Sequence, residues 1–83
     1  SLHIASMYGH LDIVKLLIEN GIDINKQDNY GYTPLHIASE KRHLDIVKLL
    51  TENGIDINKQ DRDGYTPLHI ASMNGYLDIV KLL

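Results

Sequence analysis

Histidine is the residue whose number and spacing in this chain most invite a chemical role. The five histidines fall into two sets, and the members of each set are 33 residues apart in the sequence. We call such a set of equivalent positions a column: one column holds His3, His36 and His69, and the other holds His10 and His43. A metal site needs several ligands that converge at a fixed spacing, and a predicted break between helices separates the two columns. No pair has the His-x-x-x-His spacing that places two ligands on one helix face. We therefore expect no metal ligand among them.

The acidic and hydroxyl side chains also lack a catalytic arrangement. Asp45 and its counterparts begin a repeated helix, where negative charge interacts favourably with the helix dipole, and Lys48 follows three residues later as an exposed partner of small energetic value. No two carboxylates flank a predicted pocket, and no base stands at a motif spacing from Ser39 or its counterparts. A glycine-rich phosphate loop is also missing. The sequence predicts neither an enzyme nor a bound cofactor.

Composition narrows the classes of partner and compartment. The 83 residues carry a net charge of -3, with both signs scattered, whereas a nucleic-acid-binding protein would normally show a basic stripe. Apolar runs are only a few residues long, so no membrane span is expected. Cysteine is absent, which fits a reducing compartment. We expect an intracellular, cytoplasmic protein that binds neither nucleic acid nor membrane.

Two long motifs recur along the whole chain with a period of 33 residues. Leu-His-Ile-Ala-Ser occurs at 2–6, 35–39 and 68–72. Leu-Asp-Ile-Val-Lys-Leu-Leu occurs at 11–17, 44–50 and 77–83. A fixed period of this length indicates one supersecondary unit stacked on copies of itself.

Each unit is predicted to contain two helices. Thr33 can cap a first helix over residues 35 to about 41, and Pro34 suits the first helical turn because its missing N–H leaves no bond unmade there. Apolar residues then recur at helical spacing from Leu44, which predicts a second helix. That helix should end before Gly54, since glycine readily adopts the left-handed conformation that follows many helices.

The connections between the helices carry three further signals. Residues 55–58 alternate apolar and polar side chains, so we expect an extended segment that leads into a turn. Asp28 and Asp61 open the turn and should bond to the local backbone. Arg42 stands where another copy has Gly75, and a positive φ there would cost arginine about 1 kcal/mol relative to glycine.

The combined pattern resembles the ankyrin repeat. Its features are Gly31-Tyr-Thr-Pro-Leu-His36, then Leu44-x-Ile-Val-x-Leu-Leu50, then Asn53-Gly-Ile-Asp-Ile-Asn58. The resemblance implies an all-α repeat solenoid of L-shaped units, each with two antiparallel helices and a projecting β-turn. It also implies that the His36 imidazole bonds to neighbouring backbone turns, and that turn tips and first helices form a concave binding face.

The copies at the two ends are incomplete. We interpret residues 1–83 as one ankyrin repeat domain fragment, with a partial repeat at 1–27, a complete repeat at 28–60 and a truncated repeat at 61–83. Neither end has the polar outer face of a capping repeat. We therefore expect a slice of a longer array, whose apolar ends permit end-to-end self-association.

Columns in which the copies differ are the place to seek a binding site, because identical columns are explained by shared packing. Most of these columns fall in the turn tips and on the solvent side of the first helices, and tyrosine, arginine and methionine there suit a protein interface. Drift at exposed positions would explain the same variation. With the two invariant turn tyrosines added, the candidate protein-binding residues are Met7, Tyr8, Asn29, Tyr30, Tyr32, Glu40, Lys41, Arg62, Asp63, Tyr65, Met73 and Asn74.

These observations favour a protein–protein interaction module, a scaffold or regulatory domain that binds another protein on its concave face. A rigid stack loses little ordering entropy when a partner docks on it. The alternative is a structural spacer or spring, part of a longer array without a dedicated ligand. The near-identity of the copies is the feature that supports this alternative.

Overall fold

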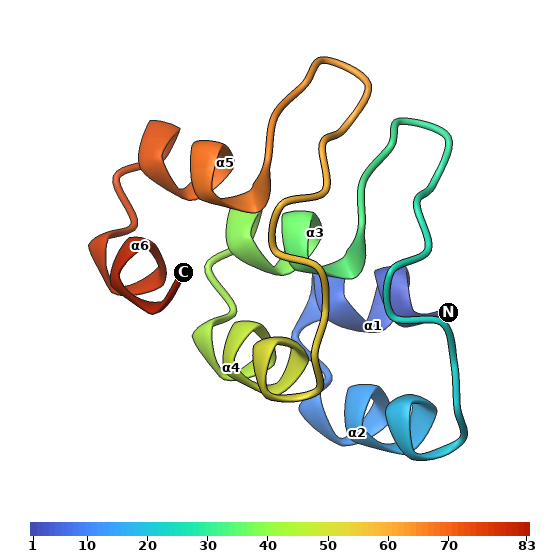
Figure 1. Cartoon of the computed structure of the whole chain (residues 1–83). Coiled ribbons are helices and arrows are strands. Elements are labelled where there is room, and N and C mark those ends of the chain that lie inside the picture. Colours follow the sequence, from blue (N-terminus) through green and yellow to red (C-terminus); the bar gives the residue numbers. More distant parts are fainter.

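The computed structural model describes residues 1–83 as three pairs of helices with no strand (Figure 1). The first helix of each pair has seven residues, and the second is six or nine residues long. The all-α repeat architecture expected from the period is thus confirmed. The helices are α1 (Leu2–Tyr8), α2 (Leu11–Glu19), α3 (Pro34–Glu40), α4 (Leu44–Glu52), α5 (Pro67–Met73) and α6 (Leu77–Leu82).

The helices form two layers, and long loops project from one side of the stack. Helix α3 lies between α1 and α5, while α4 lies between α2 and α6 (Figure 1). The loops that join α2 to α3 and α4 to α5 extend beyond the row of first helices, side by side (Figure 1). Each helix pair with its loop makes one L-shaped unit, and the loop tips stand over the first-helix layer.

The predicted cap explains why the first helix begins where it does. The Thr33 hydroxyl oxygen accepts a bond of 3.3 Å from the backbone N–H of His36, and the Thr33 N–H donates in return to His36 Nδ1 at 3.1 Å. Pro34 occupies the first helical position, as expected. Thr66 and His69 repeat the arrangement at the start of α5. The cap satisfies backbone groups that a helix end would otherwise leave without partners.

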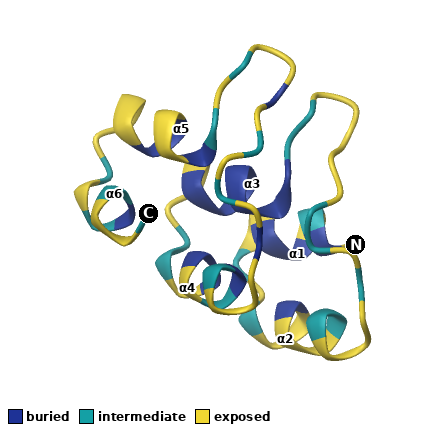
Figure 2. Ribbon diagram, in the orientation of Figure 1, coloured by how far each residue is buried: buried dark blue, intermediate teal, exposed yellow.

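Each copy buries its apolar faces against its neighbours. Ile46 and Ile79 are fully buried because a copy precedes each of them, whereas their counterpart Ile13 is 48% exposed. On the opposite face Leu35 is fully buried, and its counterpart Leu68 in the last copy is 40% exposed. The buried residues therefore concentrate on α3, in the middle copy (Figure 2). Stacking, more than the packing inside one unit, creates the core.

The backbone of residues 55–58, which follow α4, turns more sharply than their alternation of apolar and polar side chains predicts. The Asp56 carboxylate accepts a bond of 2.9 Å from the backbone N–H of Asn58, which closes a turn instead of extending the chain. The backbone N–H of Asp56 donates to Asn25 Oδ1 of the preceding copy at 2.8 Å. The alternation misled because the aspartate competes for backbone donors, as Asp commonly does in loops. Ile55 is buried in the core, with 5% of its surface exposed, and Ile57 is half-buried against the core.

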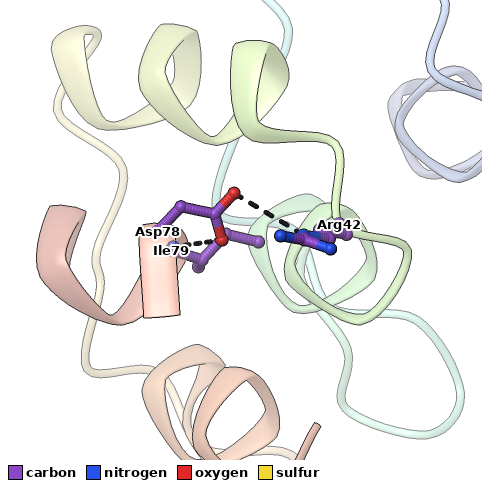
Figure 3. Close-up of polar contacts among 3 residues, drawn as sticks. All are labelled: Arg42, Asp78 and Ile79. Carbon is purple, nitrogen blue, oxygen red and sulfur yellow. Dashed lines mark hydrogen bonds and ion pairs between the residues drawn. The ribbon is translucent and has the colours of Figure 1, made fainter. Parts of the chain in front are cut away.

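Arg42 adopts the positive φ that its glycine column predicts. Its φ is 59°, and its side chain reaches the next copy, where Nε lies 3.6 Å from Asp78 Oδ2 (Figure 3). Its guanidinium carbon also lies 5.4 Å from the centre of the Tyr76 ring. These exposed contacts offset part of the backbone strain.

The expected aspartate–lysine pairs within the second helices do not form. Arg42–Asp78 is the one ion pair of the structure. Asp45 and Asp78 instead accept bonds of 2.8 and 2.9 Å from the N–H groups of the residues that follow them, at the helix starts. The helix terminus offers these carboxylates a backbone donor that competes with a mobile lysine.

Two glycines with the same backbone conformation should lose different amounts of stability when they are replaced by alanine, because only one of them lies close to the next copy. Gly31 and Gly54 have φ values of 80° and 81°. A Cβ on Gly54 would meet nothing within 4 Å, whereas a Cβ on Gly31 would lie 2.7 Å from the backbone nitrogen of Arg62. Gly54→Ala should lower the free energy of unfolding by about 1–2 kcal/mol through strain alone. Gly31→Ala should lose a further amount of about 1–3 kcal/mol because the next turn must shift.

Urea unfolding followed by circular dichroism measures both losses. Gly54→Ala is the matched control, since it shares the backbone strain without the close contact. Equal losses for the two variants would contradict the tight contact between neighbouring turns.

Candidate protein-binding surface

One aspartate organises each projecting turn. Asp28 Oδ1 accepts bonds of 2.9 Å from the backbone N–H groups of Tyr30 and Tyr32, and Asp61 Oδ1 does the same for Asp63 and Tyr65. A backbone bond from each aspartate N–H to the carbonyl of the tyrosine four residues later, Tyr32 or Tyr65, closes the turn. The expected local role of these aspartates is confirmed. Each turn therefore presents its variable tip residues on a fixed frame.

A histidine links each turn to the first helix of the preceding copy. His36 Nε2 lies 2.9 Å from the Tyr65 carbonyl oxygen, and His3 Nε2 lies 2.8 Å from the Tyr32 carbonyl oxygen. Because His36 Nδ1 accepts the Thr33 N–H, the proton must be on Nε2, which donates to Tyr65. The structural role implied by the ankyrin resemblance is confirmed for these two histidines.

Burial lowers the pKa of His36 below its ordinary value. The side chain is fully buried in the middle of the stack, and desolvation penalises its charged form. Its bond to the Tyr65 carbonyl and the charges of Asp61 and Asp28 oppose the shift without reversing it. A neutral imidazole is also the form that the hydrogen bonds require, since Nδ1 must accept the Thr33 N–H.

Contacts between the turns hold their tips at a fixed spacing. The backbone N–H of Arg62 donates to the Tyr30 carbonyl at 3.0 Å. Gln27 Nε2 donates at 2.9 Å to the carbonyls of Gly31 and Gln60, so one side chain spans two turns. Gln27 was not among the residues predicted from the sequence, although it recurs as Gln60 in the repeated motif Asn-Gly-Ile-Asp-Ile-Asn-Lys-Gln. Neighbouring tips thus form one continuous surface.

The predicted binding residues lie along this surface with unequal exposure. Tyr8, Tyr30 and Met73 are well exposed, at 64–66% of their surfaces, while Met7 is 38% exposed. Tyr32 is half-buried, since its ring packs near those of Tyr30 and His36 with centroid separations of 6.1 and 5.9 Å. The remaining members are exposed: Asn29, Glu40, Lys41, Arg62, Asp63, Tyr65 and Asn74.

Half of the predicted residues meet in one hollow between the second and third copies. We call this hollow, of about 260 Å³, the acidic hollow. Two of its residues, Asp61 and Ile70, were not predicted as binding residues, because both columns are invariant and their place here depends on stacking. Its lining consists of Tyr32, Glu40, Asp61, Asp63, Tyr65, Ile70, Met73 and Asn74.

A second hollow, of about 300 Å³, lies beside the turn tips and contains Tyr30 and Arg62, and both Tyr32 and Asp63 line the two hollows. The other predicted residues line neither hollow; Met7 and Tyr8 lie at the end of α1. Two further hollows, of about 410 and 350 Å³, lie along α2 and contain no predicted residue.

Negative charge dominates the acidic hollow. Burial, followed by the charges of Asp61, Glu40, Asp63 and Asp28, raises the pKa of the Tyr32 hydroxyl above its ordinary value. None of these carboxylates has a salt-bridge partner, since Arg42–Asp78 is the one ion pair. The hollow therefore favours cationic groups over anionic ones.

Two hydroxyl groups inside the stack have no polar partner. Ser6 and Ser39 are fully buried, and their hydroxyls have no hydrogen-bond partner, so no base activates them. No three histidine, aspartate or glutamate side chains come together as metal ligands. None of the helices has the length and apolar character needed to cross a membrane.

The architecture described above is that of an ankyrin-repeat protein, and comparison with known families agrees. The family described as ankyrin repeats in three copies matches residues 2–83. The chain therefore belongs to the ankyrin-repeat family. Ankyrin repeats are generally protein–protein interaction modules and are typically non-catalytic.

Individual relatives share only about one repeat with the chain. It is 53% identical over 34 residues to the serine/threonine-protein kinase VIK of Arabidopsis thaliana and to a putative ankyrin repeat protein of Rickettsia bellii. It is 55% identical over 31 residues to the mouse ankyrin repeat and MYND domain-containing protein 1. These segments cover 37–41% of this chain and 3–14% of the relatives' lengths.

The neutral His36 imidazole predicts a loss of stability in acid. Because the pKa of His36 is lowered on folding, the unfolded chain takes up the proton first as the pH falls below about 6.5, the ordinary histidine value. The contribution of His36 is complete above that pH. Below it, the free energy of unfolding should fall by up to about 1.4 kcal/mol per pH unit until the folded-state pKa is reached.

Urea unfolding at a series of pH values between neutrality and mild acid measures this dependence. His10→Gln should keep the dependence, because the His10 side chain is exposed and has no hydrogen bond. His36→Gln should be less stable at neutral pH and should show a weaker dependence. A wild-type stability that does not change over this range would contradict the neutral, buried imidazole.

Proposed function

We propose that this chain binds a partner protein on the surface formed by its turn tips and first helices. The observation that carries the proposal is the position of the side chains that differ between copies. Glu40, Asp63, Met73 and Asn74 come from a turn and two helices, yet they line one hollow.

The chemistry of this surface suits a protein partner. Exposed tyrosine and methionine supply large contact areas, and both residue types are common at interfaces. The hydrogen bonds of Gln27 and His36 hold the turns in place before binding, so that little ordering entropy is lost on this side of the complex. We infer a non-catalytic scaffold or regulatory module in an intracellular, cytoplasmic setting, for which the absence of cysteine is the supporting feature.

Loss of two exposed anchors should weaken binding without unfolding the chain. Tyr30 and Met73 are 66% and 64% exposed, so Tyr30→Ala/Met73→Ala should leave the thermal unfolding midpoint nearly unchanged. Pull-down from a cell extract, with each captured protein quantified, should show at least one partner retained by the wild type and reduced about tenfold or more with the double variant.

The matched control is Lys48→Ala/Glu52→Ala, which alters two exposed residues of α4, outside this surface. Partners retained equally by both variants and the wild type would contradict the proposed binding surface.

A spacer that assembles through its repeat faces is the second candidate function. Ile13 and Leu16 are 48% and 56% exposed on the face of the first copy, and Leu68 and Leu77 are 40% and 63% exposed on the last. These faces correspond to surfaces that pack together inside the stack, so one chain could continue the stack of another. Such head-to-tail contact would yield open chains of molecules.

Sedimentation velocity over a wide concentration range tests this self-association. The mean sedimentation coefficient should rise with concentration, and Ile13→Lys should suppress the rise because it places a charge in the contact. Glu52→Gln makes the same change in net charge at an exposed residue of α4, in the middle copy, and should have no effect. A concentration-independent monomer would contradict the spacer function.

A further inference from the structure

The acidic hollow differs chemically from the equivalent place between the first and second copies. Its two exposed acids, Glu40 and Asp63, stand where the preceding copy has the uncharged residues Met7 and Tyr30. The backbone geometry of the two turns is the same, because Asp28 and Asp61 organise both in one way. The negative charge is therefore a property of this junction and is not required by the repeat.

Neither exposed acid has a structural role. The side chains of Glu40 and Asp63 accept no hydrogen bond and form no ion pair, whereas the Asp61 carboxylate is committed to its turn. The nearest cations in the sequence are Lys41 and Arg62. Arg62 Nη1 is directed to the Asn29 carbonyl at 3.3 Å, and neither cation neutralises the hollow. Two carboxylates thus remain free to meet an external charge.

The rest of the lining is suited to the stem of a long cationic side chain. Met73 and Tyr65 are 64% and 42% exposed beside the acids, while Ile70 is 6% exposed and lies deeper. Lysine and arginine bury their methylene stems against apolar surface and keep their charged ends among polar groups. Tyrosine rings add a favourable interaction with a cation placed over their faces.

We propose that the acidic hollow receives a lysine or arginine side chain from a basic segment of the partner protein. This inference rests on the proposed function, because it assigns a chemical class to the partner of the same surface. The cationic group meets Glu40 and Asp63, and its stem lies against Met73 and Tyr65. The same charges repel phosphate-rich partners, so a nucleic acid or an anionic membrane does not fit.

Selection from a phage-displayed library of random dodecapeptides against the immobilised chain tests the proposal. Selected peptides are then synthesised, and their affinities are measured by fluorescence anisotropy. The test variant is Glu40→Gln/Asp63→Asn, which removes two charges that hold no structural bond. The matched control is Asp12→Asn/Glu19→Gln, which makes the same change in net charge at exposed positions of α2. Thermal unfolding checks that both variants remain folded.

The expected result is that the selected peptides share a lysine or arginine. Their affinity should fall roughly tenfold for the test variant and remain unchanged for the control. It should also fall when salt is raised from about 0.1 M to about 1 M, because the screening length decreases from about 10 Å to about 3 Å.

Other outcomes separate this inference from the proposed function. Three results would overturn the basic-segment inference. They are a selection that yields no peptide, a selection that yields peptides without a basic residue, and an affinity of the selected peptides that Glu40→Gln/Asp63→Asn leaves unchanged. If such peptides still lose affinity with Tyr30→Ala/Met73→Ala, the proposed surface stands and only the partner chemistry is wrong. Insensitivity to both double variants would overturn both.

Discussion

The burial of each copy's apolar faces by its neighbours is the constraint on which this structure depends. Helices of six to nine residues are too short to be stable alone, and each pair leaves apolar side chains on two faces. The same isoleucine column is fully buried at Ile46 and 48% exposed at Ile13, which differ only in whether a copy precedes them. A repeat therefore acquires its core from the stack, and any change that alters the stacking also alters the surface above it.

Polar contacts convert this stacking into a defined surface. His36 connects a helix start in one copy to a turn carbonyl in the next, and Gln27 bridges two turns with one amide. Gly31 allows the next turn to approach so closely that a methyl group would collide with the backbone of Arg62. These contacts are invariant or nearly so among the copies, because each junction poses the same geometric problem. They leave the tips and the ends of the first helices free to vary.

Shared and variable positions differ in what their side chains do within the structure. Where the copies agree, their side chains cap helices, close turns or fill the core. Where they differ, they are mostly exposed, and one junction combines two unpaired acids with tyrosine and methionine. Arg42 is one exception among the variable positions, since it replaces a glycine and contacts Tyr76 and Asp78 of the next copy. Its variation is explained by contact between copies and does not require a partner.

The sequence by itself determined the features that depend on residues close together in the chain. The caps at Thr33 and Thr66, the Asp28 turn and the positive φ of Arg42 all follow from local chemistry, and the 33-residue period identified the stack. Only the tertiary structure decided which of these local pieces meet. The entry of Asp61 and Ile70 into the acidic hollow depends on the distance and angle between copies, as does the pairing of Arg42 with Asp78. A periodic sequence indicates that units stack, but the distance and angle between neighbouring units are set by side-chain packing at each junction.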